Sequence, residues 1–269
     1  MNELILVLIF LLVGFSTGIF IGMLGIGGGI FFVPALYFLL PYFGIDQSAV
    51  PYYAISLSLF AGAIASSFSS VLHFRLGNID IKKALLFALG STCAAFVSVI
   101  FVIDVDPLIL KAVFAVVLFI IAVKMILDSV WKNQTQRSSK LNVAYLPPIG
   151  IVVGILAAFT GLGGGIIFFP VLYYLFLLDT KKAIGTSSAI TAATMIFASL
   201  AFYLNRNDWM GVNQMSSIYF IVGVPLGIGA MLGARVGVNF VSKSNSAVVK
   251  KIFSVLLIIV VIKIILNLW

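Results

Sequence analysis

The run Gly25, Ile26, Gly27, Gly28, Gly29, followed by Ile30, Phe31, Phe32, Val33 and Pro34, occurs a second time in this chain. Its copy begins with Gly161, Leu162, Gly163, Gly164, Gly165 and leads through Ile166, Ile167, Phe168 and Phe169 to Pro170. The glycines and the proline each recur 136 residues later (161 − 25 = 170 − 34 = 136). Two copies in register at half the chain length indicate an internal duplication.

The composition predicts a polytopic helical membrane protein whose surface contacts the lipid bilayer. Of 269 residues, 62% are hydrophobic and only 9% are charged, and the mean hydropathy is +1.24. Soluble domains carry about a quarter of charged residues. The apolar runs are long and continuous, whereas strands of a transmembrane barrel alternate apolar and polar residues. We therefore expect an all-α fold, since helices satisfy their own backbone in lipid.

The charge and the cysteine content exclude other classes. The net charge of +8 comes from basic residues that flank apolar segments, which indicates topology signals and no nucleic-acid partner. Cys93 is the only cysteine, so it forms no internal disulfide and completes no metal site. No nucleotide-binding loop, catalytic pair or metal spacing is visible. We therefore expect neither enzymatic activity nor a cofactor.

Each half of the chain contains five apolar segments. Residues 1–130 form the first predicted repeat, residues 131–142 a linker, and residues 143–269 the second repeat. The segments lie at about 4–22, 28–40, 47–74, 81–103 and 107–130, then at 143–160, 164–178, 182–203, 214–241 and 247–268. The second segment of each half is too short to cross a hydrocarbon layer about 30 Å thick. This predicts a helical hairpin that turns at the glycine run and leaves on the side from which it came.

Basic residues fall unevenly on the two sides that this segmentation defines. Thirteen lie on one side and three, Lys111, Arg206 and Lys263, on the other. The positive-inside rule then places residues 131–142 in the cytoplasm and both termini outside the plasma membrane. Because each repeat holds an odd number of segments, the repeats are expected to be inverted. Their hairpins would enter from opposite faces and meet near the midplane, as in secondary transporters.

Each glycine run opens a short helix and can form an anion site. Glycine allows several backbone N–H groups to point into one cavity at a helix N-terminus, where negative charge is favoured. The candidate substrate-binding residues are Gly27, Gly28, Gly29, Gly163, Gly164 and Gly165. Pro34 and Pro170 are expected to keep each half-helix short or kinked. The alternative is that the glycines only allow close helix packing.

Hydroxyl residues follow each hairpin on the next segment. They are Ser56 and Ser58 in the first half, then Thr186, Ser187, Ser188 and Thr191 in the second. Their hydroxyl groups can complete the coordination of an oxyanion without a fixed charge, or they can hydrogen-bond between helices. Ser56, Thr186, Ser187 and Ser188 are taken as candidate substrate-binding residues.

Three further polar residues have two interpretations each. Arg235 and Arg75 are candidates for an anion-attracting gate, or they are positive-inside anchors. His73 either couples protons or is an interfacial histidine. No carboxylate lies deep in an apolar segment, which argues against a cation as the main substrate.

The duplicated glycine run followed five residues later by proline resembles the sulfite exporter TauE/SafE family of membrane transporters. The resemblance includes Lys182 to Ser187, similar to an Ala-x-Gly-Thr-Ser element, and Pro225 to Arg235, similar to a Pro-x-Gly-x-x-x-Gly-Ala-Arg pattern. Gly77 to Asp80 is similar to a Gly-Asn-hydrophobic-Asp turn of the family. The first half departs from the pattern, because Ala49 to Ser56 stand where the Gly-Thr-Ser element would recur.

The resemblance implies a transporter of small sulfur-containing or carboxylate anions, with its site on the glycine hairpins and on Thr186 to Ser188. We therefore predict a secondary transporter that moves sulfite, a sulfonate or a related anion across the cytoplasmic membrane by alternating access. An anion channel and a non-transporting membrane assembly factor remain the alternatives. The sequence leaves open whether the chain forms a homo-oligomer.

Overall fold

The computed structural model describes residues 3–102, 141–205 and 218–244, with isolated positions between 104 and 119 and at 248. These residues form helices and connecting loops without a strand, which confirms the all-α prediction. The main helices are α1 (Glu3–Leu24), α2 (Gly29–Leu39), α3 (Val50–Arg75), α4 (Ile81–Val102), α6 (Leu146–Thr160), α7 (Gly165–Pro170), α8 (Thr180–Leu204) and α10 (Val224–Lys243). Short 3₁₀ turns extend α2 as η1 (Leu40–Phe43) and precede α6 as η2 (Val143–Tyr145). Two π-helical turns, η3 (Val171–Leu175) and η5 (Tyr219–Gly223), continue α7 and precede α10.

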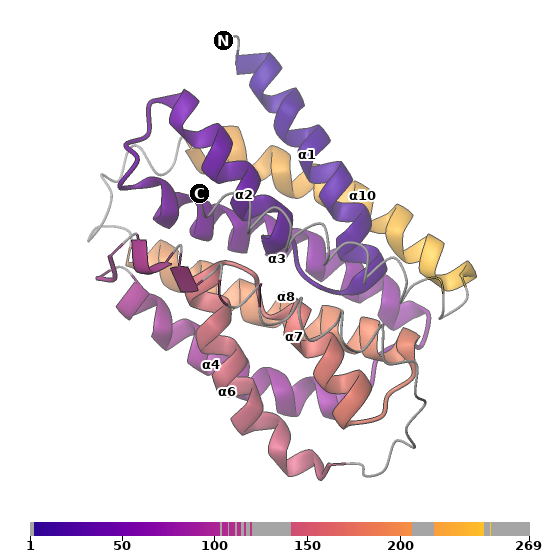
Figure 1. The fold of residues 1–269 in the computed structure, drawn as a ribbon. Helices are drawn as coiled ribbons and strands as arrows, with labels where there is room; N and C mark the ends of the chain where they lie inside the picture. Colours follow the sequence, from indigo (N-terminus) through magenta and orange to yellow (C-terminus); the bar gives the residue numbers. More distant parts are fainter. Residues whose placement is uncertain are drawn as a thin grey trace.

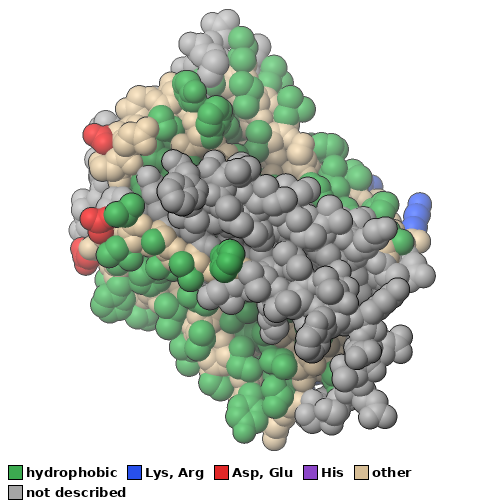
Figure 2. All heavy atoms as spheres, viewed as in Figure 1, with side chains coloured by type: hydrophobic (Ala, Val, Ile, Leu, Met, Phe, Trp, Pro, Cys, Tyr) green, Lys and Arg blue, Asp and Glu red, His purple; other side chains and the backbone are tan. Residues whose placement is uncertain are grey.

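Within the described residues, six helical stretches are long and apolar enough to cross a membrane. They are Ile5–Leu24, Val50–Arg75, Ile81–Val102, Val143–Thr160, Thr180–Leu204 and Tyr219–Lys243. Large apolar side chains cover much of the outer surface of the described part, as the green atoms in Figure 2 show. Leu12 and Leu85, for example, are 67% and 66% exposed. A surface of this kind is stable in lipid and not in water. The chain is therefore a membrane-embedded helical protein.

Eight predicted segments coincide with these helices, apart from small shifts at their ends. The two segments predicted at 107–130 and 247–268 lie almost entirely outside the described residues. The linker predicted at 131–142 is described only at its last two residues. The division into repeats at residues 1–130 and 143–269 therefore stays a prediction.

The helices pack in pairs that correspond between the two halves of the chain. α3 and α8 lie against each other at the centre, with α1 and α10 on one side and α4 and α6 on the other (Figure 1). α3 also contacts α10, and in the same way α8 contacts α4. If α1 to α4 are matched in order with α6, α7, α8 and α10, each contact has its counterpart. The helix contacts of the two halves therefore correspond to each other.

Glycines on α1 and α10 allow these two helices to touch along their backbones. Gly14, Gly18 and Gly22 repeat every four residues and face α10, where Gly229, Gly233 and Gly237 face α1. A Cβ atom on any of the six would overlap a backbone carbonyl oxygen of the other helix. The α4–α6 contact is built similarly by Gly90, Gly150 and Gly154. Small residues of this kind let membrane helices gain dispersion energy by close approach.

Charged side chains gather at the two ends of the bundle. The Nζ atom of Lys181 donates to the Ser242 carbonyl at 2.8 Å, so the start of α8 lies beside the end of α10. Tyr52 donates to the Val105 carbonyl at 2.8 Å, so the start of α3 lies beside the end of α4. The first of these regions, which we call the basic end, carries Arg75, Lys82, Lys83, Lys181, Lys182 and Lys243. The opposite, acidic end carries Asp46, Asp104 and Asp106, and Figure 2 shows red and blue side chains at opposite ends.

Candidate functional site

Both glycine runs end one helix and start the next. The first glycine loop (residues 25–28) follows α1, and the second glycine loop (residues 161–164) follows α6. Gly25 and Gly27 have φ angles of 65° and 68°, and Gly161 and Gly163 have 69° and 70°. Residues with a side chain rarely adopt this left-handed backbone conformation, which explains why glycine occupies these positions in both copies.

The two half-helices begin with the same hydrogen bonds. The N–H groups of Phe31 and Phe32 donate to the Gly28 carbonyl at 3.0 and 2.8 Å. Their counterparts 136 residues later, Ile167 and Phe168, donate to the Gly164 carbonyl, both at 2.9 Å. The duplicated sequence therefore folds into a duplicated local structure. The first N–H groups of each half-helix have no carbonyl within their own helix to bind.

The two glycine loops touch each other. A Cβ atom on Gly165 would lie 2.5 Å from the Ile26 carbonyl carbon, and one on Gly29 would overlap the Gly161 carbonyl oxygen. These contacts are again related by the 136-residue offset. Gly62, at the middle of α3, lies next to the Gly28 N–H group, and Met195, near the middle of α8, contacts Gly27 and Gly163. The loops therefore meet at the centre of the bundle, and all of their residues are buried.

The two hairpins point in opposite directions. Successive residues of α1 contact successive residues of α10, so the two helices are parallel and α1 runs toward the basic end. α2 then leads back to Asp46 at the acidic end. α6 runs parallel to α4 toward the acidic end, and α7 with η3 leads back to Asp179 before α8. The N-termini of α2 and α7 consequently face each other at the centre, from opposite ends of the molecule.

Two serines fasten the loops to the central helices. The Ser187 hydroxyl on α8 donates to the Gly25 carbonyl at 2.9 Å and lies 3.2 Å from the Gly165 carbonyl. On α3, the Ser58 hydroxyl donates to the Gly161 carbonyl at 2.9 Å. Gly25 and Gly161 are equivalent glycines, so Ser58 and Ser187 play the same part in the two halves. Ser187 thus lies at the site, and its hydroxyl hydrogen is already donated to a loop carbonyl.

The other predicted hydroxyl residues are buried but bind elsewhere. Ser56 donates to the Tyr53 carbonyl of its own helix at 3.1 Å, and Ser188 donates to the Ser69 hydroxyl at 2.9 Å. Thr186 accepts a hydrogen bond from the Asp80 N–H group at 2.9 Å. The described contacts therefore bring Ser187, but not Ser56, Thr186 or Ser188, onto the glycine loops.

Thr186 joins two of the elements quoted in the sequence analysis. The turn from Gly77 to Asp80 packs on the start of α8, where a Cβ atom on Gly185 would overlap the Asn78 carbonyl oxygen. Asp80 begins α4 by accepting from the Lys83 N–H group at 3.1 Å, and it pairs with the Lys83 ammonium group. Burial raises the pKa of the Asp80 carboxyl, but the hydrogen bonds from Lys83 outweigh it and hold this pKa below its usual value. This contact is structural and lies at the basic end.

Two buried hydroxyl groups of the central helices have no hydrogen-bond partner within the described part of the chain. They are Ser66 Oγ on α3 and Thr191 Oγ1 on α8, and both residues are fully buried. The Thr191 methyl carbon would lie 3.0 Å from a Cβ atom on Gly27, and the Ser66 carbonyl oxygen lies 3.4 Å from the Ser188 hydroxyl. Leaving a buried hydroxyl unpaired costs about 1–3 kcal/mol. Buried hydroxyl groups of this kind are candidates for contact with a ligand.

Thr191 belongs to the hydroxyl residues predicted after the second hairpin, whereas Ser66 was not predicted from the sequence. A signal for Ser66 existed, because it lies four residues after Gly62 on the same face of α3. The Ser58–Ser187 equivalence, an offset of 129 (187 − 58), pairs Ser66 with Met195 (195 − 66 = 129). The two halves therefore differ at this place, with a hydroxyl in one half and a thioether in the other.

The two prolines behave differently. Pro170 is the last α-helical residue of α7, and the helix continues from there as the π-helical turn η3. Pro34 lies inside α2, which continues to Leu39.

The aromatic rings of Phe32 and Phe168 cover Gly28 and Gly164, where added Cβ atoms would meet these rings. In each half-helix, a phenylalanine ring therefore packs against the glycine that precedes the helix.

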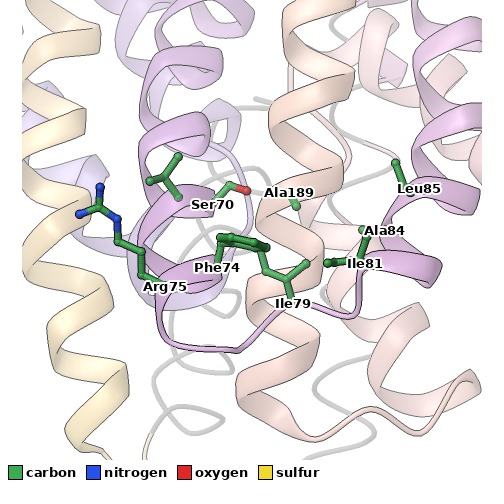
Figure 3. Close-up of a pocket in the computed structure, with 9 residues that line it drawn as sticks. Ser70, Phe74, Arg75, Ile79, Ile81, Ala84, Leu85 and Ala189 are labelled. Carbon is green, nitrogen blue, oxygen red and sulfur yellow. The ribbon is translucent and has the colours of Figure 1, made fainter.

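The two arginines proposed as a gate lie away from the loops. Arg75 is exposed at the edge of a pocket of about 430 Å³ at the basic end, and its side chain points away from Ile79, Ile81 and Ala84 in Figure 3. The pocket is lined mainly by apolar side chains of α3, α4 and the turn between them. Arg235 is exposed on α10. Neither arginine contacts the glycine loops, and a gating role for them stays a prediction.

Two broken helices that meet inside a bundle of membrane-spanning helices define a membrane transporter. The chain belongs to the sulfite exporter TauE/SafE family, whose model matches residues 10–264. The resemblance seen in the glycine runs is thereby confirmed.

Relatives from distant organisms cover almost the whole chain. A probable membrane transporter protein of Methanocaldococcus jannaschii is 28% identical over 241 residues, which is 89% of this chain and 88% of the relative. One from Haemophilus influenzae is 28% identical over 258 residues, or 95% of this chain and 97% of the relative. One from Bacillus subtilis is 24% identical over 273 residues and covers 94% of each. No solved structure matches the chain.

Proposed function

We propose that this protein is a secondary transporter that binds a small anion between its two glycine loops and moves it across the cytoplasmic membrane by alternating access. The observation that carries the proposal is the meeting of the α2 and α7 N-termini at the centre of the bundle. Sulfite, a sulfonate or a small carboxylate is the expected substrate class, in agreement with the name of the family.

The electrostatics of the half-helices favour an anion. Each helix N-terminus carries the equivalent of about +0.5 elementary charge, and its first N–H groups are free to donate. The α2 and α7 segments, Gly29–Tyr42 and Gly165–Leu175, direct two such ends at one place. No fixed positive side chain of the described residues contacts the loops, so binding relies on dipoles and hydroxyl groups. Binding of this kind is weak enough to allow release.

The repeats are proposed to be inverted. Three observations support this: the 136-residue offset of the loop contacts, the matching helix pairs, and the opposite directions of the two hairpins. Inverted repeats supply two arrangements of similar energy that face opposite sides of the membrane. In the present arrangement the loops are buried, so the site must open toward one side to take up its substrate.

Removing one unpaired hydroxyl tests the site. Thr191→Val and Ser66→Ala are each expected to weaken anion binding about tenfold to hundredfold, since a hydrogen bond to a charged group contributes about 1.5–3 kcal/mol. Thermal-shift titrations of purified protein with sulfite, sulfate, thiosulfate, sulfonates and small carboxylates measure this. Thr92→Val is the matched control, because the Thr92 hydroxyl donates within its own helix at 2.7 Å. Equal anion affinity in Thr191→Val, Ser66→Ala and wild type would remove both hydroxyls from the site.

The basic end is proposed to face the cytoplasm, which places both termini outside. In a Cys93→Ser background, a cysteine at exposed Ser48 should react with an impermeant thiol reagent added to intact cells. A cysteine at exposed Lys82 should react only after the cells are permeabilised. The reverse labelling pattern would show that the orientation is opposite.

A further inference from the structure

His73 is a buried histidine at the basic end of α3 that the anion site does not use. Its side chain is fully buried, and its Nε2 atom lies 3.2 Å from the Gly22 carbonyl of α1. A carbonyl only accepts, so Nε2 carries the hydrogen of the neutral ring. The Nδ1 atom then presents a lone pair, and no group of the described residues hydrogen-bonds to it. The neutral ring can therefore accept a proton at Nδ1 inside the protein.

A row of polar residues leads from this ring toward the first glycine loop. Ser66, Ser69 and His73 are spaced three and four residues apart and share one face of α3. Gly62 continues this face and lies next to the Gly28 N–H group. Ser69 accepts from Ser188, and Ser66 Oγ is unpaired. The row spans about 16 Å, at 1.5 Å per residue over eleven residues.

A second connection runs through α1. Gly22 lies in the last turn of α1, three residues before Gly25 of the first glycine loop. Carbonyl groups at a helix C-terminus carry partial negative charge and stabilise a cationic ring. A proton on His73 therefore strengthens its bond to the end of α1, and through this bond it acts on the position of the loop.

Among the described residues, none of the charged groups around the basic end pairs with the His73 imidazole. These groups are Arg75, Asp80, Lys82, Lys83, Asp179, Lys181, Lys182, Arg235 and Lys243. Asp80 pairs with Lys83, and Lys181 donates to the Ser242 carbonyl. The side chains of the other six are exposed. α1 contributes only the Gly22 carbonyl to the ring.

We propose that His73 binds the proton that accompanies the anion during transport, an inference that rests on the proposed function. A proton taken from water on one side binds Nδ1 and forms an imidazolium, and it returns to water on the other side after the anion has left. A buried imidazolium without a counter-ion is unfavourable, and so is a buried anion. Each therefore favours binding of the other, and this coupling is reciprocal.

Proton and anion movement can be measured together in proteoliposomes that contain a pH-sensitive dye. With a small sulfonate as the probe, which stays fully ionised near neutral pH and carries no proton of its own, wild-type protein should move protons in proportion to the anion. His73→Gln keeps an amide that can donate to the Gly22 carbonyl but cannot take up a proton, so its ratio of protons to anions should fall at least tenfold. Lys82→Gln, at an exposed basic residue of the same end, is the control and should keep the wild-type ratio.

A binding measurement on wild-type protein keeps the inference testable if His73→Gln does not fold. Addition of the same sulfonate to the purified protein in weak buffer should cause uptake of up to one proton per molecule. Absence of this uptake, or a wild-type proton ratio in folded His73→Gln, would overturn the role of His73. Absence of any anion binding or flux in wild type would instead contradict the proposed function itself.

Discussion

Replacing Gly165 by alanine is expected to abolish anion binding and transport. The Cβ atom of alanine would lie 2.5 Å from the Ile26 carbonyl carbon and close to the Gly25 carbonyl oxygen, so the second half-helix could no longer approach the first loop. Overpacking of this kind costs about 1–3 kcal/mol in a well-packed interior. Both contact partners are backbone atoms that cannot rotate away. The N-termini of α2 and α7 would separate, and the anion would lose donors from one of them.

The measurement is anion-dependent thermal stabilisation of the purified variant, followed by flux in proteoliposomes. Gly165→Ala should still give folded protein, because α1, α10, α4 and α6 pack elsewhere, but its flux should fall to the level of protein-free vesicles. Gly44→Ala is the control: alanine strains the backbone there, because Gly44 has a φ of 75°, but nothing lies within 4 Å of the added Cβ atom and no helix contact is disturbed. Gly29→Ala should behave as Gly165→Ala does. Wild-type flux in either loop variant would mean that the meeting of the loops is unnecessary.

Replacing Gly18 by leucine is expected to prevent formation of a stable bundle. Gly18 lies in the middle of the α1–α10 contact, where an added Cβ atom would overlap the Ala230 carbonyl oxygen and its Cα atom. A leucine side chain would force the two helices apart and remove the backbone contact on which six glycines depend. We expect a loss larger than the usual ~1–3 kcal/mol for overpacking.

Size-exclusion chromatography and thermal melting in detergent measure this effect. The expected outcome for Gly18→Leu is little or no monodisperse protein. Ser16→Leu is the control, because it adds the same side chain to the same helix at an exposed position. A Gly18→Leu protein that melts at the same temperature as Ser16→Leu would show that the α1–α10 contact tolerates separation.

Sequence periodicity and duplication were sufficient to predict the helices and the place where the chain breaks. Long apolar runs predict membrane helices because lipid offers the backbone no partners. The glycine runs predict left-handed turns because other residues adopt them rarely. The structure has these turns at Gly25, Gly27, Gly161 and Gly163. The contact of the two loops was expected from the inverted arrangement of the segments.

The partners of individual hydroxyl groups could not be predicted in the same way. Ser56 and Ser58 both lie on α3, yet only Ser58 binds a loop carbonyl, since two residues along a helix turn the side chain by about 200°. Thr186 and Ser187 are neighbours, but one binds the turn at Asp80 and the other binds the loops. The face of a helix that contacts the loops depends on the rotation of the helix about its own axis in the bundle, and the sequence does not specify this rotation.

The α1–α10 glycine contact has a signal in the sequence that was not among the predictions. Glycines recur every four residues at Gly14, Gly18 and Gly22, and again at Gly229, Gly233 and Gly237. This spacing is typical of membrane helices that touch along their backbones. The pairing of these two stripes with each other joins helices more than 200 residues apart, and only the folded arrangement establishes it.

Counterflow of a labelled small anion in proteoliposomes tests the central claim most directly. Vesicles with wild-type protein and internal unlabelled sulfite should accumulate labelled sulfite transiently, and the initial rate should saturate with external concentration. A carrier with one site that is open to alternate sides predicts both features, and Gly165→Ala should show neither. Uptake that does not saturate and shows no counterflow would indicate a channel, and absence of uptake for every small oxyanion and carboxylate would contradict the account.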